Sequence, residues 1–389
     1  MAKHALLGAS SAARWLNCTP SARLTEKIED TISEYAAEGT LAHSIGEMLL
    51  RIELGGNDGA DVAEFEEFLK ETRNNKLYYE GMVDEVEDYT GYVMEQYNAA
   101  LAKTKDAKIF LEEKLDYSTY VPSGFGTGDC IIIADGEMEI IDLKFGKGVE
   151  VSPVDNPQLK LYALGAYEKY SFIYGIEKIK MTIAQVRLNN ISSSDISAEM
   201  LEEWAENVVK PKAKLAYAGK GEQVPGEWCT FCKVKATCSA RATANIAFYS
   251  AHSDRDKKLL DIVEIAEILG MANELKKWAD DIQAYALETA LEGTKYPGWK
   301  LVEGRSNRKI TDEDALATKL MAEGYKENKI YKPKTLEGIT ALEKVVGKKK
   351  FAELAAGLID KPPGKPTLVS EDDNRPELDS IETEFDFIN

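Results

Sequence analysis

The sequence lacks several features that would assign the protein to a well-defined class. No apolar run is long enough to cross a bilayer, and the N-terminus has no charged segment followed by an apolar one, the pattern of a secretion signal. There are no internal repeats. Acidic residues outnumber basic ones, and the net charge is -19 at pH 7. This balance argues against a general polyanion binder, because phosphate contacts depend on Lys and Arg. We therefore expect a cytoplasmic protein without a membrane-spanning segment.

Cysteine is scarce as well, with five residues in the chain. In a chain without a secretion signal, such cysteines indicate a reducing compartment, where close spacing is typical of metal binding rather than of a disulfide. Cys229, Cys232 and Cys238 form a Cys-x2-Cys-x5-Cys cluster, and Cys18 lies far upstream. A zinc ribbon would normally have two Cys-x2-Cys pairs, and only one is present. Cys130 lies in an apolar segment and is interpreted as a core thiol.

The strongest chemical signal lies at the end of an expected strand, residues 137–144. Asp142 and Lys144 are separated by one residue, so their side chains point to the same face of the strand. A preceding strand begins with Asp129, and the turn at residues 134–136 joins the two strands as a hairpin, so this carboxylate can lie opposite Asp142. Two carboxylates and a lysine are the groups that metal-assisted phosphodiester hydrolysis needs. The alternative is an exposed ion pair at a strand end.

Two expected helices add polar residues that could face this strand end. The first covers about residues 33–51 and carries His43, which could present its imidazole to a metal held by the strands. A helix that starts near Pro153 or Pro157 carries Gln158 and Tyr162 one turn apart. The alternatives are a core histidine in the first helix and an ordinary amphipathic edge in the second. The sequence leaves both alternatives open.

The order of these motifs resembles that of the RecB-like branch of the PD-(D/E)xK nuclease superfamily. The matching motifs are Gly39-Thr40-x-x-His43, Gly128-Asp129, Asp142-Leu143-Lys144 and Gln158-x-x-x-Tyr162. The resemblance covers roughly residues 8–240, and its specificity lies in the ordered set because each motif is short. The most similar subgroup contains an iron-sulfur cluster and includes the nuclease domain of AddB-type helicase-nucleases and CRISPR-associated exonucleases.

The resemblance implies a role for each residue of the set. A divalent metal, Mg²⁺ or Mn²⁺, would be held by the side chains of His43, Asp129 and Asp142 and by the carbonyl of Leu143. Lys144 would be the catalytic lysine, and Gln158 and Tyr162 would steady the site and contact the nucleic acid. Four thiolates would hold a [4Fe-4S] cluster that ties the start of the domain to its end, namely Cys18, Cys229, Cys232 and Cys238. Zinc and unligated thiols are the alternatives at the cysteines.

The expected fold is α/β, with a restriction-endonuclease-like core in which helices flank a mixed central sheet. Its strands are expected near residues 108–117, 128–134, 137–144 and 178–188. The predicted organisation is a nuclease domain in 1–245 with a helical insertion at about 55–105, a helical connector in 246–294, a small basic module of a short hairpin and short helices in 295–362, and an acidic, disordered tail in 363–389.

The basic module could bind nucleic acid. Residues 298–350 contain thirteen Lys and Arg against eight Asp and Glu. Trp299, Tyr325 and Tyr331 are interspersed among them, and such mixtures can hold single strands through phosphate contacts and base stacking. A solvated module with lysine-rich helix faces is an equally good interpretation.

These observations together predict a metal-dependent DNA nuclease that uses one or two metal ions. We expect an exonuclease of recombination or end processing, acting on DNA with single-stranded character or free ends. A similarity to phage and prophage members of the superfamily suggests a recombinase or single-strand-binding protein as partner, by analogy alone. The alternatives are a non-catalytic nucleic-acid-binding or scaffold protein that retains the fold, and a zinc-stabilised regulatory protein.

Overall fold

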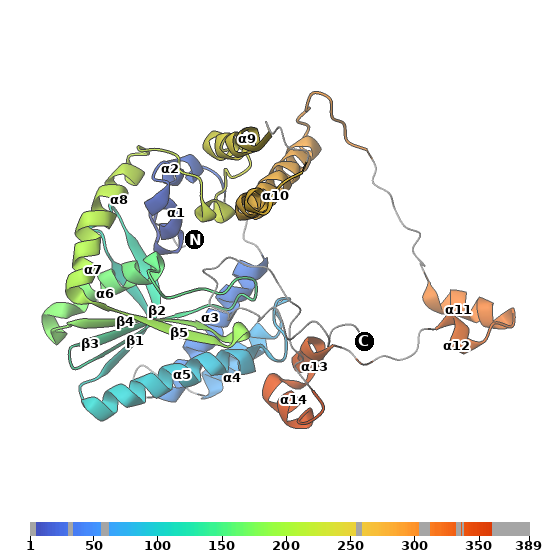
Figure 1. The fold of residues 1–389 in the computed structure, drawn as a ribbon. Coiled ribbons are helices and arrows are strands. Elements are labelled where there is room, and N and C mark those ends of the chain that lie inside the picture. The colour runs from blue at the N-terminus through green and yellow to red at the C-terminus, as the bar shows by residue number, and fades with distance from the viewer. Residues whose placement is uncertain are drawn as a thin grey trace.

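The chain folds around one mixed sheet with the strand order β1-β2-β3-β4-β5 (Figure 1). The computed structural model describes residues 5–29, 34–55, 62–253, 259–302, 312–331, 336 and 338–359. The strands are β1(Lys108–Asp116), β2(Phe125–Ala134), β3(Glu137–Leu143), β4(Lys178–Gln185) and β5(Asn190–Ser197). Strands β3 and β4 are parallel and all other neighbours are antiparallel. Because a parallel pair needs a crossover, helix α6(Pro157–Tyr174) connects these two strands.

Helices flank the sheet and make up the described C-terminal region, so the prediction of a mixed α/β fold is confirmed. The helices before β1 are η1(Ala9–Ser11), α1(Ala12–Asn17), α2(Ser21–Thr25), α3(Glu34–Leu54), α4(Val62–Thr72) and α5(Met82–Lys103). After β4 come η3(Val186–Leu188), α7(Ala198–Trp204), the π-helical turn η4(Ala205–Val209), α8(Lys210–Tyr217), η5(Glu227–Phe231), α9(Ser239–Ser253) and α10(Ile262–Leu291). The last four are α11(Glu313–Ala322), α12(Glu327–Ile330), α13(Ile339–Val346) and α14(Lys348–Leu354).

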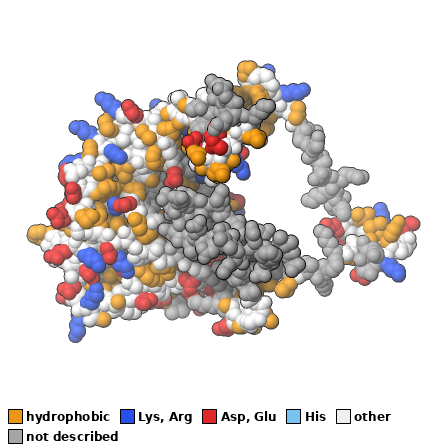
Figure 2. Space-filling model, in the orientation of Figure 1, with side chains coloured by type: hydrophobic (Ala, Val, Ile, Leu, Met, Phe, Trp, Pro, Cys, Tyr) orange, Lys and Arg blue, Asp and Glu red, His pale blue; other side chains and the backbone are white. Residues whose placement is uncertain are grey.

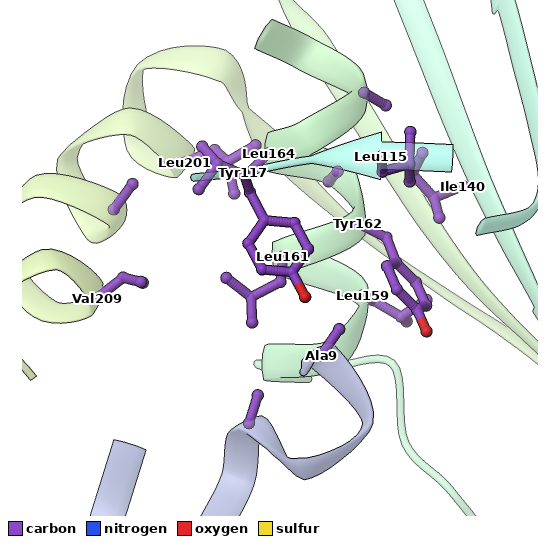
Figure 3. Close-up of a cluster of buried hydrophobic side chains, with 14 of the residues drawn as sticks. Ala9, Leu115, Tyr117, Ile140, Leu159, Leu161, Tyr162, Leu164, Leu201 and Val209 are labelled. Atoms are coloured by element: carbon purple, nitrogen blue, oxygen red, sulfur yellow. The ribbon is translucent and has the colours of Figure 1, made fainter. Parts of the chain in front are cut away.

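Two hydrophobic cores lie on the two faces of the sheet. Ile131 and Ile133 of β2 pack with α6, α1 and α7 in one core, and Cys130 and Ile132 pack with α3 and α5 in the other. This division follows from the alternation of side chains along a strand. Figure 3 shows the first core, with side chains from η1, β3, α6, α7 and η4 gathered around Tyr117. Cys130 is fully buried, as a core thiol should be.

Local sequence signals explain where helix α6 begins and ends. The side chain of Asn156 caps the helix by accepting hydrogen bonds from the backbone N–H groups of Gln158 and Leu159, at 3.0 and 3.3 Å. Pro157 occupies the first helical position, where its missing N–H is harmless. At the other end Gly175 adopts the left-handed conformation, with φ of 57°. The cap fixes Gln158 in the first turn of the helix, next to the end of β3.

The N-terminal helices are held against residues from the end of the α8 region. The Thr19 hydroxyl donates a hydrogen bond to the carbonyl of Lys220 at 2.6 Å, and Arg23 Nε donates to the carbonyl of Tyr217 at 2.7 Å. The Arg23 guanidinium also lies over the Tyr217 ring, 4.7 Å from its centroid. These contacts bring Cys18 close to the cysteines that follow α8.

Several expected elements differ from the observed ones. The sequence did not predict strand β5, because its residues are mostly polar. In the structure β5 is an edge strand that pairs with β4. Helix α5 lies within the predicted insertion and buries Met82, Val86, Tyr89 and Val93 in the core beside α3. The division of the chain into domains stays a prediction.

The C-terminal region is described only in part. Helix α11 contacts α12, and α13 contacts α14. Among the described residues of 295–359 there is no strand. Residues 303–311 lie outside the described residues, as do the acidic tail and five of the thirteen Lys and Arg of residues 298–350. Within the described part of the chain, no helix combines the length and apolarity that a bilayer crossing needs. Figure 2 shows acidic and basic side chains interspersed over the visible face of the sheet-bearing part.

Candidate metal centre and active site

Three carboxylates lie at the same level on three neighbouring strands. The β1–β2 register on either side of Glu112 places this residue across from Asp129. The β2–β3 register pairs Cys130 with Ile141, and one further step places Asp129 across from Asp142. The row crosses the middle of β2 and the end of β3, because β2 begins at Phe125, before the start that the sequence predicts. Glu112 was not among the residues that the sequence singled out.

The backbone of β1 is distorted at Glu112, the first of the three aligned carboxylates. Glu112 has φ of 46°, a left-handed conformation that costs a residue other than glycine about 1 kcal/mol. The regular alternation of β1 breaks here, since Phe110 and Leu115 contact the same core although five positions separate them. Backbone strain of this kind is concentrated at functional sites, where it sets the direction of a side chain.

His43 joins two of the carboxylates to form a group that can hold a metal ion. Ligand atoms of His43, Glu112 and Asp129 all lie within 4.8 Å of one another, and His43 Nδ1 is 3.3 Å from Asp129 Oδ1. Helix α3 reaches this position because Ile45 is fully buried against the sheet. At Gly46 an added Cβ would lie 3.3 Å from the Tyr89 ring of α5, so α3 packs closely there. One imidazole and two carboxylates suit a divalent cation such as Mg²⁺ or Mn²⁺.

The carboxylates of Glu112 and Asp129 favour a positive charge between them and His43. Burial, followed by the charge of Asp129, raises the pKa of Glu112 to about 7. Burial alone would lower the pKa of His43, but the Asp129 carboxylate outweighs it and raises that pKa to about 9. A proton on His43 or a metal ion can supply the charge. Because a metal binds the neutral imidazole, the two compete for the same place.

Asp142, Lys144 and Gln158 form a closed ring beside the metal group. Lys144 Nζ lies 2.8 Å from Asp142 Oδ2, an ion pair without the alignment of a hydrogen bond, and it donates to Gln158 Oε1 at 3.1 Å. Gln158 Nε2 donates to Asp142 Oδ1 at 3.2 Å and to the Tyr162 hydroxyl at 3.3 Å. The amide of Gln158 thereby fixes the carboxylate and the ammonium relative to each other.

The ring keeps Lys144 charged. Burial alone would lower the pKa of Lys144, but the Asp142 carboxylate outweighs it and raises this pKa. The pKa of Asp142 is raised too, because its side chain is almost fully buried and the opposing pull of Lys144 does not cancel the effect. Lys144 is therefore a cation at neutral pH, suited to stabilising negative charge rather than to accepting a proton.

Asp129 links the metal group to the ring. One oxygen, Oδ1, faces His43, and the other, Oδ2, accepts a hydrogen bond from the backbone N–H of Leu143 at 2.7 Å. The structure thus brings together all the residues that the sequence singled out around the strand end. It adds Glu112 to the metal group, while the oxygens of Asp142 are held by Lys144 and Gln158. Metal binding by Asp142 and by the Leu143 carbonyl stays a prediction.

The four expected cluster cysteines line one small cavity. Cys18 follows α1, Cys229 lies in η5, Cys232 follows it directly, and Cys238 precedes α9. All five cysteines of the chain are free thiols, and burial raises the pKa of the Cys229 thiol. No three of the sulfurs lie within 4.8 Å of one another in the described part of the chain.

Replacing Glu112 with glutamine is expected to remove most of the stabilisation that a divalent metal gives. At a Mn²⁺ concentration of about 100 times Kd, a bound ion stabilises the folded wild type by about 2.7 kcal/mol. Thermal unfolding with and without Mn²⁺ measures this gain as a rise in Tm. The control is Glu113→Gln, whose carboxylate pairs with Lys169 and should leave the Mn²⁺ response intact. If Mn²⁺ raises the Tm of Glu112→Gln as much as that of the wild type, Glu112 is not a metal ligand.

Two solved structures resemble the chain at a low level. One, from Eubacterium rectale and described as a "Putative exonuclease", is 14% identical and has a TM-score of 0.33, over 67% of this chain and 92% of its own. The other, SSO0001, is 13% identical and has a TM-score of 0.23, over 59% of this chain and 96% of its own. These TM-scores are too low to support an argument about fold or activity. By sequence, residues 4–376 match the family described as "Protein of unknown function (DUF2800)", and the chain belongs to that family.

Proposed function

We propose that the protein is a metal-dependent DNA nuclease that acts as an exonuclease in recombination or DNA end processing. One observation carries the proposal: the group of His43, Glu112 and Asp129 lies next to a charged lysine, Lys144. Asp142 and the half-buried amide of Gln158 hold this lysine in place. Oxygen ligands for a hard cation beside a fixed ammonium suit an attack on a phosphodiester. The ordered motifs of the RecB-like nucleases support the same reaction.

The residues of the site would divide the work of hydrolysis. A divalent ion held by His43, Glu112 and Asp129 would polarise the phosphate and lower the pKa of a bound water. Lys144 would donate a hydrogen bond to an oxygen of the scissile phosphate, where negative charge builds as the water attacks. Because its ammonium is already oriented by Gln158, little reorganisation is needed at that moment. Asp142 keeps the lysine protonated throughout.

We further propose that the four cysteines hold a [4Fe-4S] cluster with a structural role. Two observations support the proposal: all four cysteines line one cavity, and their order in the chain matches that of the iron-sulfur subgroup that the sequence resembles. When bound, the cluster would join the end of α1 to the segment after α8. Single-stranded or free DNA ends as substrate, and a recombinase or single-strand-binding protein as partner, rest on the family resemblance.

Degradation of end-labelled DNA tests the nuclease proposal. Wild-type protein with Mg²⁺ or Mn²⁺ is expected to release labelled nucleotides from linear DNA, to spare closed circular DNA, and to be inactive in EDTA. The Asp129→Asn variant should be inactive because it loses one carboxylate of the metal group. Asp135→Asn is the matched control, because Asp135 lies in the hairpin turn with φ of 51°, a conformation that asparagine accepts. DNA binding without metal-dependent degradation would favour a non-catalytic binding protein instead.

A further inference from the structure

The loop that follows β3, residues 145–151, is shaped by one buried side chain at the end of β4. Gln185, which is 2% exposed, donates hydrogen bonds from Nε2 to the carbonyls of Gly146 and Val149, at 3.0 and 2.8 Å. Its Oε1 accepts a hydrogen bond from the backbone N–H of Val151 at 3.0 Å. A single amide thus satisfies three backbone groups of the loop, which fixes the path of the chain.

A second side chain from the same region ties the loop to the helices around the site. Arg187 donates to the carbonyl of Phe145 at 3.3 Å, and its guanidinium lies 4.7 Å from the centroid of that ring. It also pairs with Glu38 of α3 at 3.0 Å and with Glu85 of α5 at 3.3 Å. Its side chain is 7% exposed, so these contacts are largely shielded from water. The start of the loop is therefore rigidly placed beside Lys144.

Neither backbone conformation nor packing within the protein requires glycine at two positions of this loop. Gly146 and Gly148 are exposed, neither has a positive φ, and a Cβ added to either would meet no atom within 4 Å. Gly126, in contrast, could not carry a side chain, because its Cβ would lie 2.8 Å from the Tyr162 ring. Glycine at an exposed position without a conformational or packing need is typical of a place where a ligand approaches the backbone closely.

We infer that residues 145–150 form a preshaped loop against which the sugar-phosphate backbone of the substrate strand lies. This inference rests on the proposed function and names the part of the site that holds the substrate. The loop follows Lys144 directly in the chain and leads to helix α6, which carries Gln158, so it connects two of the reacting groups. Gly146 and Gly148 allow the strand to come close, and Val149, 75% exposed, offers an apolar contact for a sugar.

Lys147 gives the loop a cation for a phosphate. Its side chain is 39% exposed, and its Nζ lies 3.9 Å from Glu85 Oε1. If Lys147 contacts one phosphate of a single strand, the Lys147→Met variant should lower the slope of log Kd against log salt by about 0.7. Fluorescence anisotropy over a series of KCl concentrations measures the slope. An unchanged slope would overturn the phosphate contact.

Enlarging Gly148 tests the loop without disturbing the fold. The Gly148→Val variant should keep the wild-type Tm, because Gly148 is exposed and a Cβ added there meets no atom within 4 Å. Its Kd for a labelled single-stranded oligonucleotide, measured in Ca²⁺, and its KM for hydrolysis should rise about tenfold, with kcat nearly unchanged. The Kd and KM of Gly148→Ala should lie between those of the wild type and those of Gly148→Val. The matched control is Gly270→Val in α10, at another exposed glycine without positive φ, where an added Cβ would also meet no atom within 4 Å.

The outcomes separate this inference from the nuclease proposal. Equal Kd values for wild type, Gly148→Val and Gly270→Val would overturn the loop proposal whether or not DNA is degraded. If the wild type binds DNA without hydrolysing it, and Gly148→Val but not Gly270→Val weakens this binding, the result would support the loop and contradict the nuclease. A wild type that neither binds nor degrades DNA would overturn both.

Discussion

Replacing Lys144 with methionine is expected to lower kcat for DNA hydrolysis about 10²- to 10³-fold, the usual loss when one fixed donor to a charged transition state is removed. The KM for DNA should change little, because the lysine acts mainly on charge that develops during the reaction. The physical reason is the geometry of the ring: Gln158 and Asp142 hold the ammonium 3.1 and 2.8 Å away, so its orientation is set before substrate arrives. Initial rates over a range of DNA concentrations separate the two constants.

The methionine variant also leaves Asp142 without its cation, so a second variant guards against misfolding. Lys144→Arg keeps the positive charge beside the buried carboxylate, but its planar fork cannot reproduce the position of an ammonium. It should retain the fold and lose most of the activity. The control is Lys169→Met, which removes a lysine that is 47% exposed and pairs with Glu113. Wild-type kcat in either Lys144 variant, with Tm preserved, would exclude the lysine from the reaction.

Replacing Cys18 with serine is expected to have the largest effect on stability of any single change in the chain. A structural metal centre contributes on the order of 10 kcal/mol, as zinc does in small domains, and this is comparable with the total stability of a typical protein. Loss of one thiolate should therefore remove the visible absorbance and the iron of anaerobically purified protein and strongly lower its Tm. Absorbance spectra, iron content per chain and thermal unfolding measure the three effects.

Cys130→Ala is the matched control for the cysteine variant. Cys130 is fully buried in the core beside α3 and does not line the cavity of the other four cysteines, so this variant should keep its iron and its colour. Colourless, iron-free wild type with intact cysteines would remove the cluster hypothesis. Zinc found in its place by elemental analysis would support the alternative ligand.

The parts of the fold and site that the sequence predicts correctly depend on short-range rules. The alternation of side chains puts Asp142 and Lys144 on one face, and a tight turn brings Asp129 to the next strand. The cap of α6 is readable because Asn156 and Pro157 are adjacent in the chain. These signals need only a few consecutive residues, so they survive without knowledge of the tertiary structure.

The parts that the sequence does not predict depend on register and on distant contacts. Glu112 belongs to the metal group only because its backbone flips and because β1 lies across from Asp129, and neither fact is encoded in neighbouring residues. A search for acidic residues in the strand before the hairpin could have found it. Gln185 and Arg187 act on a loop almost forty positions away in the chain, and no local pattern marks either residue.

The contacts that close the N-terminal helices onto the α8 region also set an order of events during synthesis. Thr19 bonds to Lys220 and Arg23 to Tyr217, partners that lie 201 and 194 positions downstream. A ribosome that adds about 5 to 20 residues per second needs about 10 to 40 seconds to cover that stretch. During this time α1 and α2 lack α8 as a packing partner, although α6, which α1 also contacts, has already been made. Cys18 is likewise translated long before the other three cysteines of its cavity. The contacts of α1 and α2 with α8 therefore become possible only late in synthesis, although these helices are among the first to be translated.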